Sequence, residues 1–447
     1  MGKLDGIYEQ GSEGVVPVEH VCGSAGTGKT FLMRQRIAED PDYGMLCSTT
    51  GISAVNLGAI TINSLLGYFD TNSLSEAFFN GWTLKRLTKL CEQKYKNLVI
   101  DEVSMLDGVQ LDIIYQSVKM LNETRSMEGK PPLGIVVTGD FAQLPPIKAK
   151  WAFEADCWPF FEAATTRLTK VWRQTDAKFL EAINHIRAGR GMVGATILSQ
   201  LGVEFVKHAD TKFQGTTIMA KNDVVDNFNW LCHSQIPGVP TTVYSNRWMT
   251  VGRQMPSEWK HIPAEMKLKP SSYCMILTND TPNFTFVNGD CGHIVGYNAE
   301  SQTFTIRLVR NQEEVEIGTI TRKVTQIEPP DELLQRHPGA KEDDLRELDR
   351  EQGMPYWDPE VGRNGAWVVG AITFYPLRLA YASTVHKCQG ISLDAVQIDI
   401  SQNFFSAPSM VYVALSRART SQGLRIVGTP ALLGSRCHVD PTVSRWL

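Results

Sequence analysis

Residues 23–30 read GSAGTGKT and fit the phosphate-loop pattern G-x-x-x-x-G-K-[ST] at every fixed position. The glycines let backbone N–H groups turn inward around a triphosphate. Lys29 then supplies positive charge to the β and γ phosphates, and the Thr30 hydroxyl is placed to hold Mg²⁺. The flanking segments predict a short buried strand, VEHVC, and a helix, FLMRQRIAED. We therefore predict an α/β nucleotide-binding fold; the alternative is a glycine-rich turn with no catalytic role.

The spacing of apolar runs predicts the architecture. From residue 18 to about 161, helical stretches separate the runs VEHVC, GMLCST, NLVID and GIVVTGD, which is typical of a parallel sheet covered on both faces. A second α/β pattern begins near Leu168 with TTIMA and DVVDNFNWLCHS, and resumes with YAST, AVQIDI and LRIVG. Between its halves, HIVGYNAESQTFTIRLV predicts a hairpin turning at 298–301, and EVEIGTITRKVTQIE predicts further strands. These closely spaced strands favour a small inserted β-barrel.

We expect a first domain over residues 1–165, a second over 166–245 and 366–447, and the inserted domain over 246–365. The total of 447 residues suits about three domains. The most apolar stretch, WVVGAITFYPLRLAYA, carries Pro376 and Arg378, so buried strands are expected there and not a membrane helix. We expect no membrane partner.

Composition restricts the partners and the compartment. The net charge is −4, so a nucleic acid would need local basic grooves. None of the nine cysteines forms a C-x-x-C pair, which argues against a structural zinc or a disulfide framework. Reduced cysteines and the lack of a signal peptide favour a cytoplasmic protein.

Two further strands end in polar residues that suit nucleotide chemistry. Residues 97–102 read NLVIDE, which places Asp101 at the carboxyl edge of the sheet beside the phosphate loop. There Asp101 would hold Mg²⁺, directly or through water, and Glu102 would orient or deprotonate the attacking water. Residues 134–146 read GIVVTGDFAQLPP, and the Gln143 amide can sense a γ-phosphate. The alternatives are a chance acid pair and an ordinary loop.

Four segments resemble the helicases of superfamily one, in this order along the chain: GSAGTGKT, STTGISAVNLGAITINSLLG, LVIDEVSML and VVTGDFAQLPPI. The branch that contains the PIF, RecD and Dda proteins is the most similar. The later segments LTKVWRQ, FVNGDCG, YASTVHKCQGISLD and YVALSRART agree, so the resemblance runs from about residue 18 to 428. It implies two RecA-like domains, an SH3-like barrel, a short pin insertion over about 67–92, and ATP-dependent 5′→3′ movement on single-stranded DNA.

The resemblance also assigns residues to the nucleotide. Arg173 and Arg417 would reach from the second α/β domain to the γ-phosphate, where an arginine is worth about 10³–10⁵ in rate. The alternative for either is a surface salt bridge worth under about 1 kcal/mol. Gly390 would lie where a side chain does not fit beside the nucleotide. The expected catalytic residues are Lys29, Asp101, Glu102, Gln143, Arg173 and Arg417; the nucleotide-binding set is Gly23, Ala25, Gly26, Thr27, Gly28, Lys29, Thr30, Gln143, Arg173, Gly390 and Arg417; Thr30 and Asp101 hold the metal.

A single-strand track is expected across both α/β domains. By resemblance, its residues hold phosphates without reading sequence, and they are Thr49, Asn63, Ser64, Thr384 and His386. The alternative for His386 is a core histidine. The family's Thr-x-His-Ser is here TINS at 61–64, and Asn63 can form hydrogen bonds but cannot carry a histidine's charge.

The pin insertion contains four aromatic residues, Phe69, Phe78, Phe79 and Trp82. One at the tip could stack on the first base pair, and core packing is the alternative for each. Upstream of the phosphate loop, Gln10 is the sole candidate for an adenine-selecting glutamine. The preference for ATP therefore comes from the resemblance.

The leading hypothesis is a monomeric, ATP- and Mg²⁺-dependent motor that acts on single-stranded and forked DNA, with single-strand-binding or replication proteins as candidate partners. One alternative is a RecD-like motor subunit of a nuclease or recombination complex. Another is a phosphate-loop kinase or switch protein with no track. The second α/β half and its two arginines count against the kinase.

Overall fold

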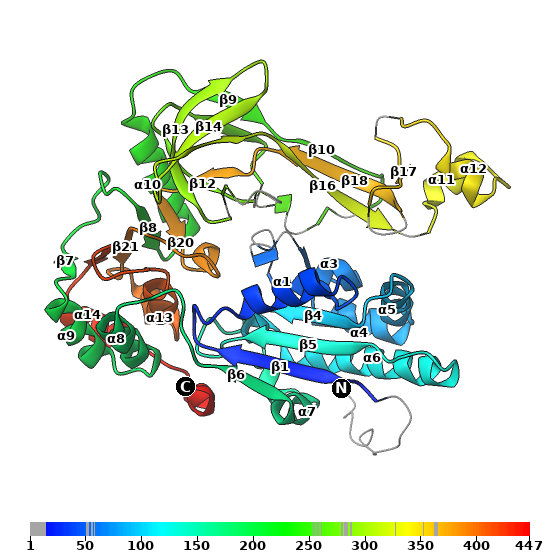
Figure 1. The fold of residues 1–447 in the computed structure, drawn as a ribbon, viewed down its shortest axis with the longest axis horizontal. Coiled ribbons are helices and arrows are strands. Elements are labelled where there is room, and N and C mark those ends of the chain that lie inside the picture. Colours follow the sequence, from blue (N-terminus) through cyan, green and yellow to red (C-terminus); the bar gives the residue numbers. More distant parts are fainter. Residues whose placement is uncertain are drawn as a thin grey trace.

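The computed structural model describes residues 15–447 except 51–52, 55–56, 58, 254, 257–258, 261, 279, 281–284, 287, 327, 352 and 362–364. Two parallel α/β units lie side by side, and antiparallel strands rise above them (Figure 1). No helix in this described part has the length and apolar character needed to span a membrane.

The first unit is built on a six-stranded sheet with the order β3-β2-β4-β5-β1-β6, in which every pairing is parallel. The strands are β1 (Val18–Gly23), β2 (Met45–Ser48), β3 (Ile60–Thr61), β4 (Asn97–Asp101), β5 (Gly134–Gly139) and β6 (Thr165–Leu168). The predicted parallel α/β sheet is confirmed. Its four predicted strands end at one edge, so their polar carboxyl-terminal residues converge.

Helices cover both faces of this sheet because apolar side chains alternate along the strands. Val99 and Val136 point to the face covered by α1 (Lys29–Glu39), while Leu98 and Ile135 point to the opposite core. That opposite core is packed by α3 (Ile62–Leu66), α4 (Thr71–Phe79), α5 (Trp82–Glu92), α6 (Gly108–Met127) and α7 (Trp158–Ala163).

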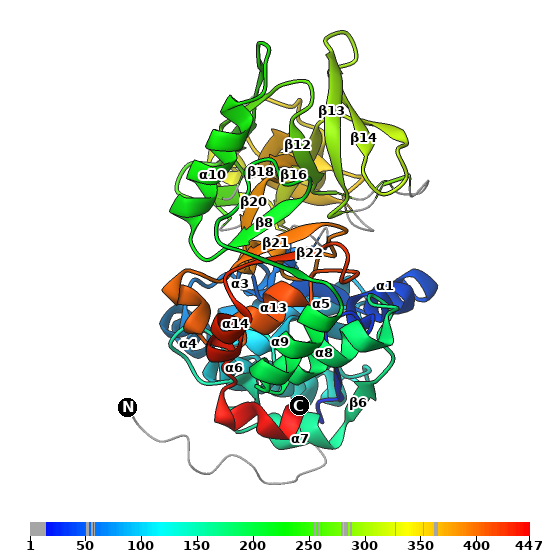
Figure 2. The ribbon, with the colours of Figure 1, turned by 90° about the vertical axis from the view of Figure 1, so that its left-hand side faces the viewer.

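The second unit has a five-stranded parallel sheet with the order β20-β8-β21-β22-β7. Its strands are β7 (Glu204–Val206), β8 (Thr216–Met219), β20 (Ala382–Thr384), β21 (Val396–Asp399) and β22 (Leu424–Val427). One face is covered by α10 (Asn222–Ser234), and the other by α8 (Ala177–Arg187), α9 (Gly191–Gln200), α13 (Met410–Leu415) and α14 (Pro430–Arg436) (Figure 2). Strands far apart in sequence therefore form one layer.

The segment between β8 and β20 is antiparallel. One sheet has the order β15-β14-β13-β12-β19, another joins β10, β18 and β16 with β17 on β18, and β9 pairs with β11. Their bounds are β9 (Thr241–Tyr244), β10 (Asn246–Met249), β11 (Glu265–Leu268), β12 (Tyr273–Ile276), β13 (Cys291–Asn298), β14 (Thr303–Leu308), β15 (Glu314–Ile317), β16 (Ile320–Gln326), β17 (Tyr356–Asp358), β18 (Ala366–Phe374) and β19 (Leu377–Leu379). The β13–β14 hairpin turns where the sequence predicts. Short helices α11 (Asp331–Arg336) and α12 (Glu342–Arg346) lie at the far end of β16 and β18 (Figure 1).

Strand pairing and side-chain packing assign three segments to units other than those expected from the sequence. Strand β6 pairs with β1, so the first sheet continues to Leu168, past the expected boundary at 165. Strands β18 and β19 pair with inserted strands, so the insertion extends past 365. The final turn (Pro441–Trp446) packs on the first unit, where the Trp446 ring lies 5.6 Å from His20. Local patterns do not reveal which partner a strand or terminal turn will find.

Candidate nucleotide pocket and nucleic-acid track

The phosphate loop connects β1 to α1, and its backbone needs glycine. Gly28 caps α1 with φ 87°, and Gly26 has φ 81°. A Cβ on Gly26 would also lie 2.6 Å from the Arg173 Cβ, so the loop packs tightly on the segment after β6. Lys29 Nζ donates to the carbonyls of Gly23, at 2.9 Å, and Ser24, at 3.2 Å. Its amine is thereby held over the loop.

A pocket of about 480 Å³ lies between the phosphate loop and the second unit, within the range of small-molecule sites. It is lined by Ala25, Gly26, Gly28, Lys29, Thr30, Phe31, Glu102, Gln143, Trp172, Arg173, Gly390, Ser392, Arg417 and Arg419. Most of the expected nucleotide residues therefore meet at one place. Gly23 and Thr27 do not line this pocket. The Thr27 hydroxyl instead donates to the Ser24 carbonyl within the loop, at 2.9 Å.

Oxygen atoms suited to Mg²⁺ lie beside Lys29. The Thr30 hydroxyl donates to Asp101 Oδ2 at 2.7 Å, and the Thr138 hydroxyl donates to Asp101 Oδ1. Hydroxyl and carboxylate oxygens are hard ligands, and Mg²⁺ takes few of them from protein when phosphate oxygens complete its octahedron. Within the described ranges, no cluster of three His, Cys, Asp or Glu side chains could hold a metal. The residues present fit a metal that is shared with a triphosphate.

Glu102 has an unusual backbone conformation and a perturbed carboxyl. Its φ of 59° lies in the left-handed region, which non-glycine residues rarely adopt. Burial, helped by the charge of Asp101, raises the pKa of Glu102 to about 7, a value suited to a general base. Gln389 Nε2 donates to Glu102 Oε2 at 3.1 Å, and the Thr49 hydroxyl donates to the Glu102 carbonyl at 2.9 Å.

Two guanidinium groups face the phosphate loop without a carboxylate partner in the described part of the chain. Arg417 is 1% exposed, and its donors reach the Val413 carbonyl at 2.8 Å and the Ser416 hydroxyl at 2.7 Å. Arg173 donates to the Ser416 carbonyl at 2.9 Å. Burial, then the charge of Arg417, lowers the pKa of Arg173 to about 9. Neither residue is a surface salt bridge, and two cations that face one pocket, Arg417 buried and Arg173 half-buried, favour an anion.

Arg173 lies in the link between β6 and α8, so it is not part of the second sheet. Its Nη2 also donates to the Gly390 carbonyl at 3.3 Å. Gly390 has φ 79°, and a Cβ there would meet no atom of the described residues within 4 Å. Within the protein, backbone conformation and not crowding requires this glycine.

Gln143 is 3% exposed, and its Oε1 has no hydrogen-bond partner in the described part of the chain. An unpaired buried amide oxygen is costly, and in native structures it marks a site for water, an ion or a ligand. Gln143 lines the pocket, so this unpaired oxygen belongs to a residue of the pocket wall.

A buried network that the sequence did not predict joins the two units. The Ala25 N–H donates to the Tyr412 hydroxyl at 2.9 Å, and that hydroxyl donates to Asp140 Oδ2 at 2.8 Å. Arg187 Nη2 donates to Asp140 Oδ1 at 2.8 Å and to the Trp446 carbonyl at 3.0 Å. Although burial acts to raise it, the charge of Arg187 holds the pKa of Asp140 below its usual value.

Two exposed aromatic rings, which were not predicted from the sequence, also line the pocket. Phe31 is 71% exposed and Trp172 is 65% exposed. The Trp172 N–H donates to the Gly26 carbonyl at 2.8 Å, and Lys170 Nζ lies 3.6 Å from the centre of its ring. The signal available in the sequence was an aromatic directly before Arg173. Gln10, the candidate for adenine selection, lies outside the described residues.

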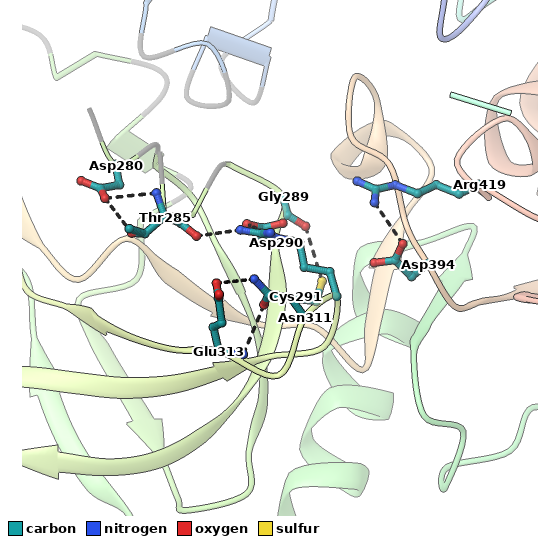
Figure 3. Close-up of polar contacts among 10 residues, drawn as sticks. Asp280, Thr285, Gly289, Asp290, Cys291, Asn311, Glu313, Asp394 and Arg419 are labelled. Carbon is teal, nitrogen blue, oxygen red and sulfur yellow. Dashed lines mark hydrogen bonds and ion pairs between the residues drawn. The ribbon is translucent and has the colours of Figure 1, made fainter. Parts of the chain in front are cut away.

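The inserted strands contact the second unit beside this pocket. Arg419 pairs with Asp394 at 3.1 Å, and opposite them Asp290 accepts from Arg310 Nε at 3.1 Å (Figure 3). A Cβ on Gly289 would lie 3.3 Å from Ile391 Cγ2. The turn before β13 therefore packs close to the segment that carries Gly390.

The five expected nucleic-acid residues lie at the ends of β2, β3 and β20. Thr49, Asn63, Ser64 and His386 are half-buried, while Thr384 is buried and its hydroxyl accepts the Lys387 N–H at 3.3 Å. Thr384 thus supports the turn that carries His386. Burial lowers the pKa of His386, so its ring is neutral at physiological pH.

The expected pin region forms the helical hairpin α4–α5. Phe79 at its tip is 81% exposed, and Phe69 and Trp82 are also exposed, whereas Phe78 packs on the core of the first unit. Core packing thus applies to Phe78 among the four. Lys85 and Lys89 on α5 pair with Glu328, each at 3.2 Å. The sheet of β16 and β18 therefore reaches the hairpin (Figure 1).

The fold and the site define a phosphate-loop nucleotide-binding protein in which a second parallel α/β unit closes the pocket. Residues 4–193 match the family of PIF1-like helicases. An ATP-dependent DNA helicase Pif1 from Bdellovibrio bacteriovorus is 28% identical over 418 residues, which cover 91% of this chain and 83% of that protein. The human ATP-dependent DNA helicase PIF1 is 27% identical over 443 residues, 94% of this chain but 59% of that protein.

Solved structures agree on the fold. The Pif1 helicase from Candida albicans superposes with a TM-score of 0.66 at 22% identity, covering 96% of this chain and 94% of that chain. A Bacteroides sp Pif1 solved with ADP-AlF4 gives 0.65 at 22% identity, covering 94% and 90%. The resemblance expected from the motifs is confirmed: residues 4–193 match the PIF1-like helicases, and 91% of the chain is similar to a helicase Pif1.

Proposed function

We propose that this chain is an ATP-dependent DNA helicase that moves 5′→3′ on single-stranded DNA and separates duplex DNA at forks. The observation that carries the proposal is the pair of arginines, half-buried Arg173 and buried Arg417, which face the phosphate loop without carboxylate partners in the described part of the chain. A triphosphate supplies the missing negative charge. Relatives named as ATP-dependent DNA helicases, and a solved Pif1 bound to single-stranded DNA, support the nucleic-acid assignment.

Each side chain of the pocket has a place in phosphoryl transfer. Lys29 binds the β and γ phosphates when its bonds to loop carbonyls are exchanged for phosphate oxygens. Glu102 accepts the proton of the attacking water, and the free Oε1 of Gln143 orients that water. Arg173 and Arg417 stabilise the charge on the transferred group.

Thr30 and Asp101 would hold Mg²⁺, which neutralises phosphate charge when it is bound. The base would lie near the exposed rings of Phe31 and Trp172. Because the arginines are held by carbonyls of the second unit, hydrolysis depends on how the two units sit against each other. A cycle of closing and opening would then move the DNA-binding surfaces relative to each other.

The finer parts of the architecture have corresponding roles. We assign the antiparallel insertion to an SH3-like barrel and the α4–α5 hairpin to the pin. Phe79 at the exposed tip suits stacking on the first base pair. We assign the track to Thr49, Asn63, Ser64 and His386, with Thr384 supporting the turn from beneath. Nine free cysteines suit a reducing cytoplasm.

The proposal is for an active monomer, with single-strand-binding and replication proteins as candidate partners. A RecD-like subunit of a larger complex would use the same pocket but would need other chains for unwinding. A phosphate-loop kinase does not need the second parallel sheet or the Tyr412 connection between the units.

Strand separation on tailed DNA forks tests the function. The purified chain with ATP and Mg²⁺ should unwind a fork with a 5′ single-stranded tail and leave a fork with only a 3′ tail paired. Lys29→Ala is the control and should separate neither. Unwinding of the 3′-tailed substrate would refute the polarity, and no unwinding by the purified chain alone would favour the multi-subunit alternative.

A further inference from the structure

Both the backbone and the side chain of Glu102 accept hydrogen bonds from the proposed track: the first from the track residue Thr49, the second from Gln389 in the turn that carries His386. At the backbone, the Thr49 hydroxyl donates to the Glu102 carbonyl at 2.9 Å, and the Thr49 N–H donates to the Asp101 carbonyl at 3.3 Å. At the side chain, Gln389 Nε2 donates to Glu102 Oε2 at 3.1 Å. Thr49 comes from the first unit and Gln389 from the second, so the carboxylate lies where the two halves of the track meet.

Gln389 is part of the turn that carries the proposed track residues of the second unit. It follows the short 3₁₀ turn His386–Cys388, and its N–H donates to the His386 carbonyl at 3.3 Å. The same turn is tied to β20 by the bond from the Lys387 N–H to the Thr384 hydroxyl. Because His386 and Gln389 belong to one hydrogen-bonded turn, a displacement of His386 also displaces Gln389.

The Gln389 side chain restricts the catalytic carboxylate. Gln389 is 2% exposed, and its amide occupies Oε2 of Glu102. No hydrogen bond among the described residues reaches the other oxygen, Oε1, of this pocket-lining residue. A carboxylate fixed through one oxygen presents the other in a defined direction, which is what abstraction of a proton from an attacking water requires.

We propose that Gln389 is a positioning residue through which nucleic acid on the track controls Glu102. This inference rests on the proposed function. DNA phosphates that settle on the His386 turn fix Gln389, and Gln389 then holds the Glu102 carboxylate with Oε1 towards the water. The water proton passes to Oε1, its oxygen bonds to the γ phosphorus, and the bond to the β–γ bridging oxygen breaks to leave ADP. Without DNA the turn is free to shift, and the carboxylate spends less time in this orientation.

The test measures ATP hydrolysis with and without saturating single-stranded DNA for Gln389→Met, which keeps the length but lacks the donor. We expect the DNA-stimulated kcat to fall about 10- to 100-fold, the effect of misplacing a catalytic group. The rate without DNA should fall less, so the ratio of stimulated to unstimulated rates should drop, while the KM for ATP and the affinity for single-stranded DNA should stay within about threefold of the unmodified protein. A second variant, Gln389→Leu, also lacks the donor and should give the same pattern.

Gln397→Met is the matched control. Gln397 is a buried glutamine in β21 that donates to the Thr217 hydroxyl at 3.0 Å, away from the pocket. This variant should keep the ratio of stimulated to unstimulated rates even where it lowers stability.

The outcomes separate this inference from the proposed function. If the unmodified protein shows no response to single-stranded DNA, the proposed function itself fails. If the unmodified protein responds and either soluble Gln389 variant responds equally, the coupling role is refuted while the function stands. A parallel fall of both rates in the Gln389 variants would show a merely structural residue and would also overturn the inference.

Discussion

Replacing Tyr412 by phenylalanine removes one oxygen atom from the buried network between the two units. That oxygen accepts the Ala25 N–H of the phosphate loop at 2.9 Å and donates to Asp140 at 2.8 Å. Tyr412 lies on α13, one turn before Arg417, while Asp140 lies three residues before Gln143. The hydrogen bond between Tyr412 and Asp140 therefore joins the segment that carries Arg417 to the segment that carries Gln143. Both of those side chains line the same pocket.

The magnitude follows from the two bonds lost. A hydrogen bond to a charged group contributes about 1.5–3 kcal/mol, and leaving a buried N–H unpaired costs about 1–3 kcal/mol. Asp140 keeps Arg187 and the Ala142 N–H, so its charge stays compensated. We expect Tyr412→Phe to destabilise the closed arrangement of the two units by about 3 kcal/mol, which is about 150-fold in the equilibrium between closed and open arrangements. The effect is on closure because the two sheets themselves remain intact.

The assay is kcat for ATP hydrolysis at saturating ATP and single-stranded DNA. Tyr412→Phe should lower kcat by at least about tenfold while thermal unfolding shifts little. In an Asp140→Asn background the same change should cost less than it does in the unmodified protein, because the bond to a charged acceptor is already lost and only the bond from the Ala25 N–H remains to be broken. Tyr43→Phe is the control: that hydroxyl lies 2.7 Å from Arg36 at the far end of α1. A kcat within about twofold of the unmodified protein, or additive effects in the double variant, would refute the reasoning.

Three further predictions concern the nucleotide pocket, the buried His20 and the tip of the α4–α5 hairpin. Lys29→Ala and Arg417→Ala should each lower turnover by about 10³-fold or more while single-strand binding, measured by fluorescence anisotropy, persists; normal hydrolysis by the Arg417 variant would disprove the closure mechanism. Burial lowers the pKa of His20 to about 3, so the unfolded chain takes up a proton below its own pKa of 6.5 and the folded chain does not. Stability should therefore fall between these values as the pH drops, by about 2 kcal/mol at pH 5 in urea unfolding, and His20→Leu should remove this contribution; an unchanged slope in the variant would contradict it. Phe79→Ala should slow fork unwinding more than ATP hydrolysis, whereas Phe69→Ala, at the other end of α4 from the hairpin tip, should have the smaller effect; equal losses of both activities would exclude a wedge role for Phe79.

The elements that could be predicted from the sequence are those with strong local patterns. The apolar runs at β1, β4 and β5 are short and bounded by turns, so they read as buried parallel strands. The polar ends of those strands predict that Lys29 and Asp101 meet at one edge of the sheet. The β13–β14 hairpin was equally visible from its alternating residues.

The remainder depends on contacts between distant segments. Tyr412 reads as one more apolar residue in the run MVYVAL, and only the fold brings its hydroxyl to Asp140. Gln389 reads as part of a glycine turn, although its amide reaches a carboxylate 287 positions away. Strand β6 is too short and too polar to indicate its partner, and nothing local shows that Trp446 returns to His20.

The most direct test of the account is the ATP hydrolysis rate measured with and without single-stranded DNA over a range of salt concentrations. The account predicts a rate that rises on adding single-stranded DNA and a stimulation that weakens steeply with salt, because phosphate contacts release counterions. A rate that no single strand, DNA or RNA, changes at any salt concentration would contradict it.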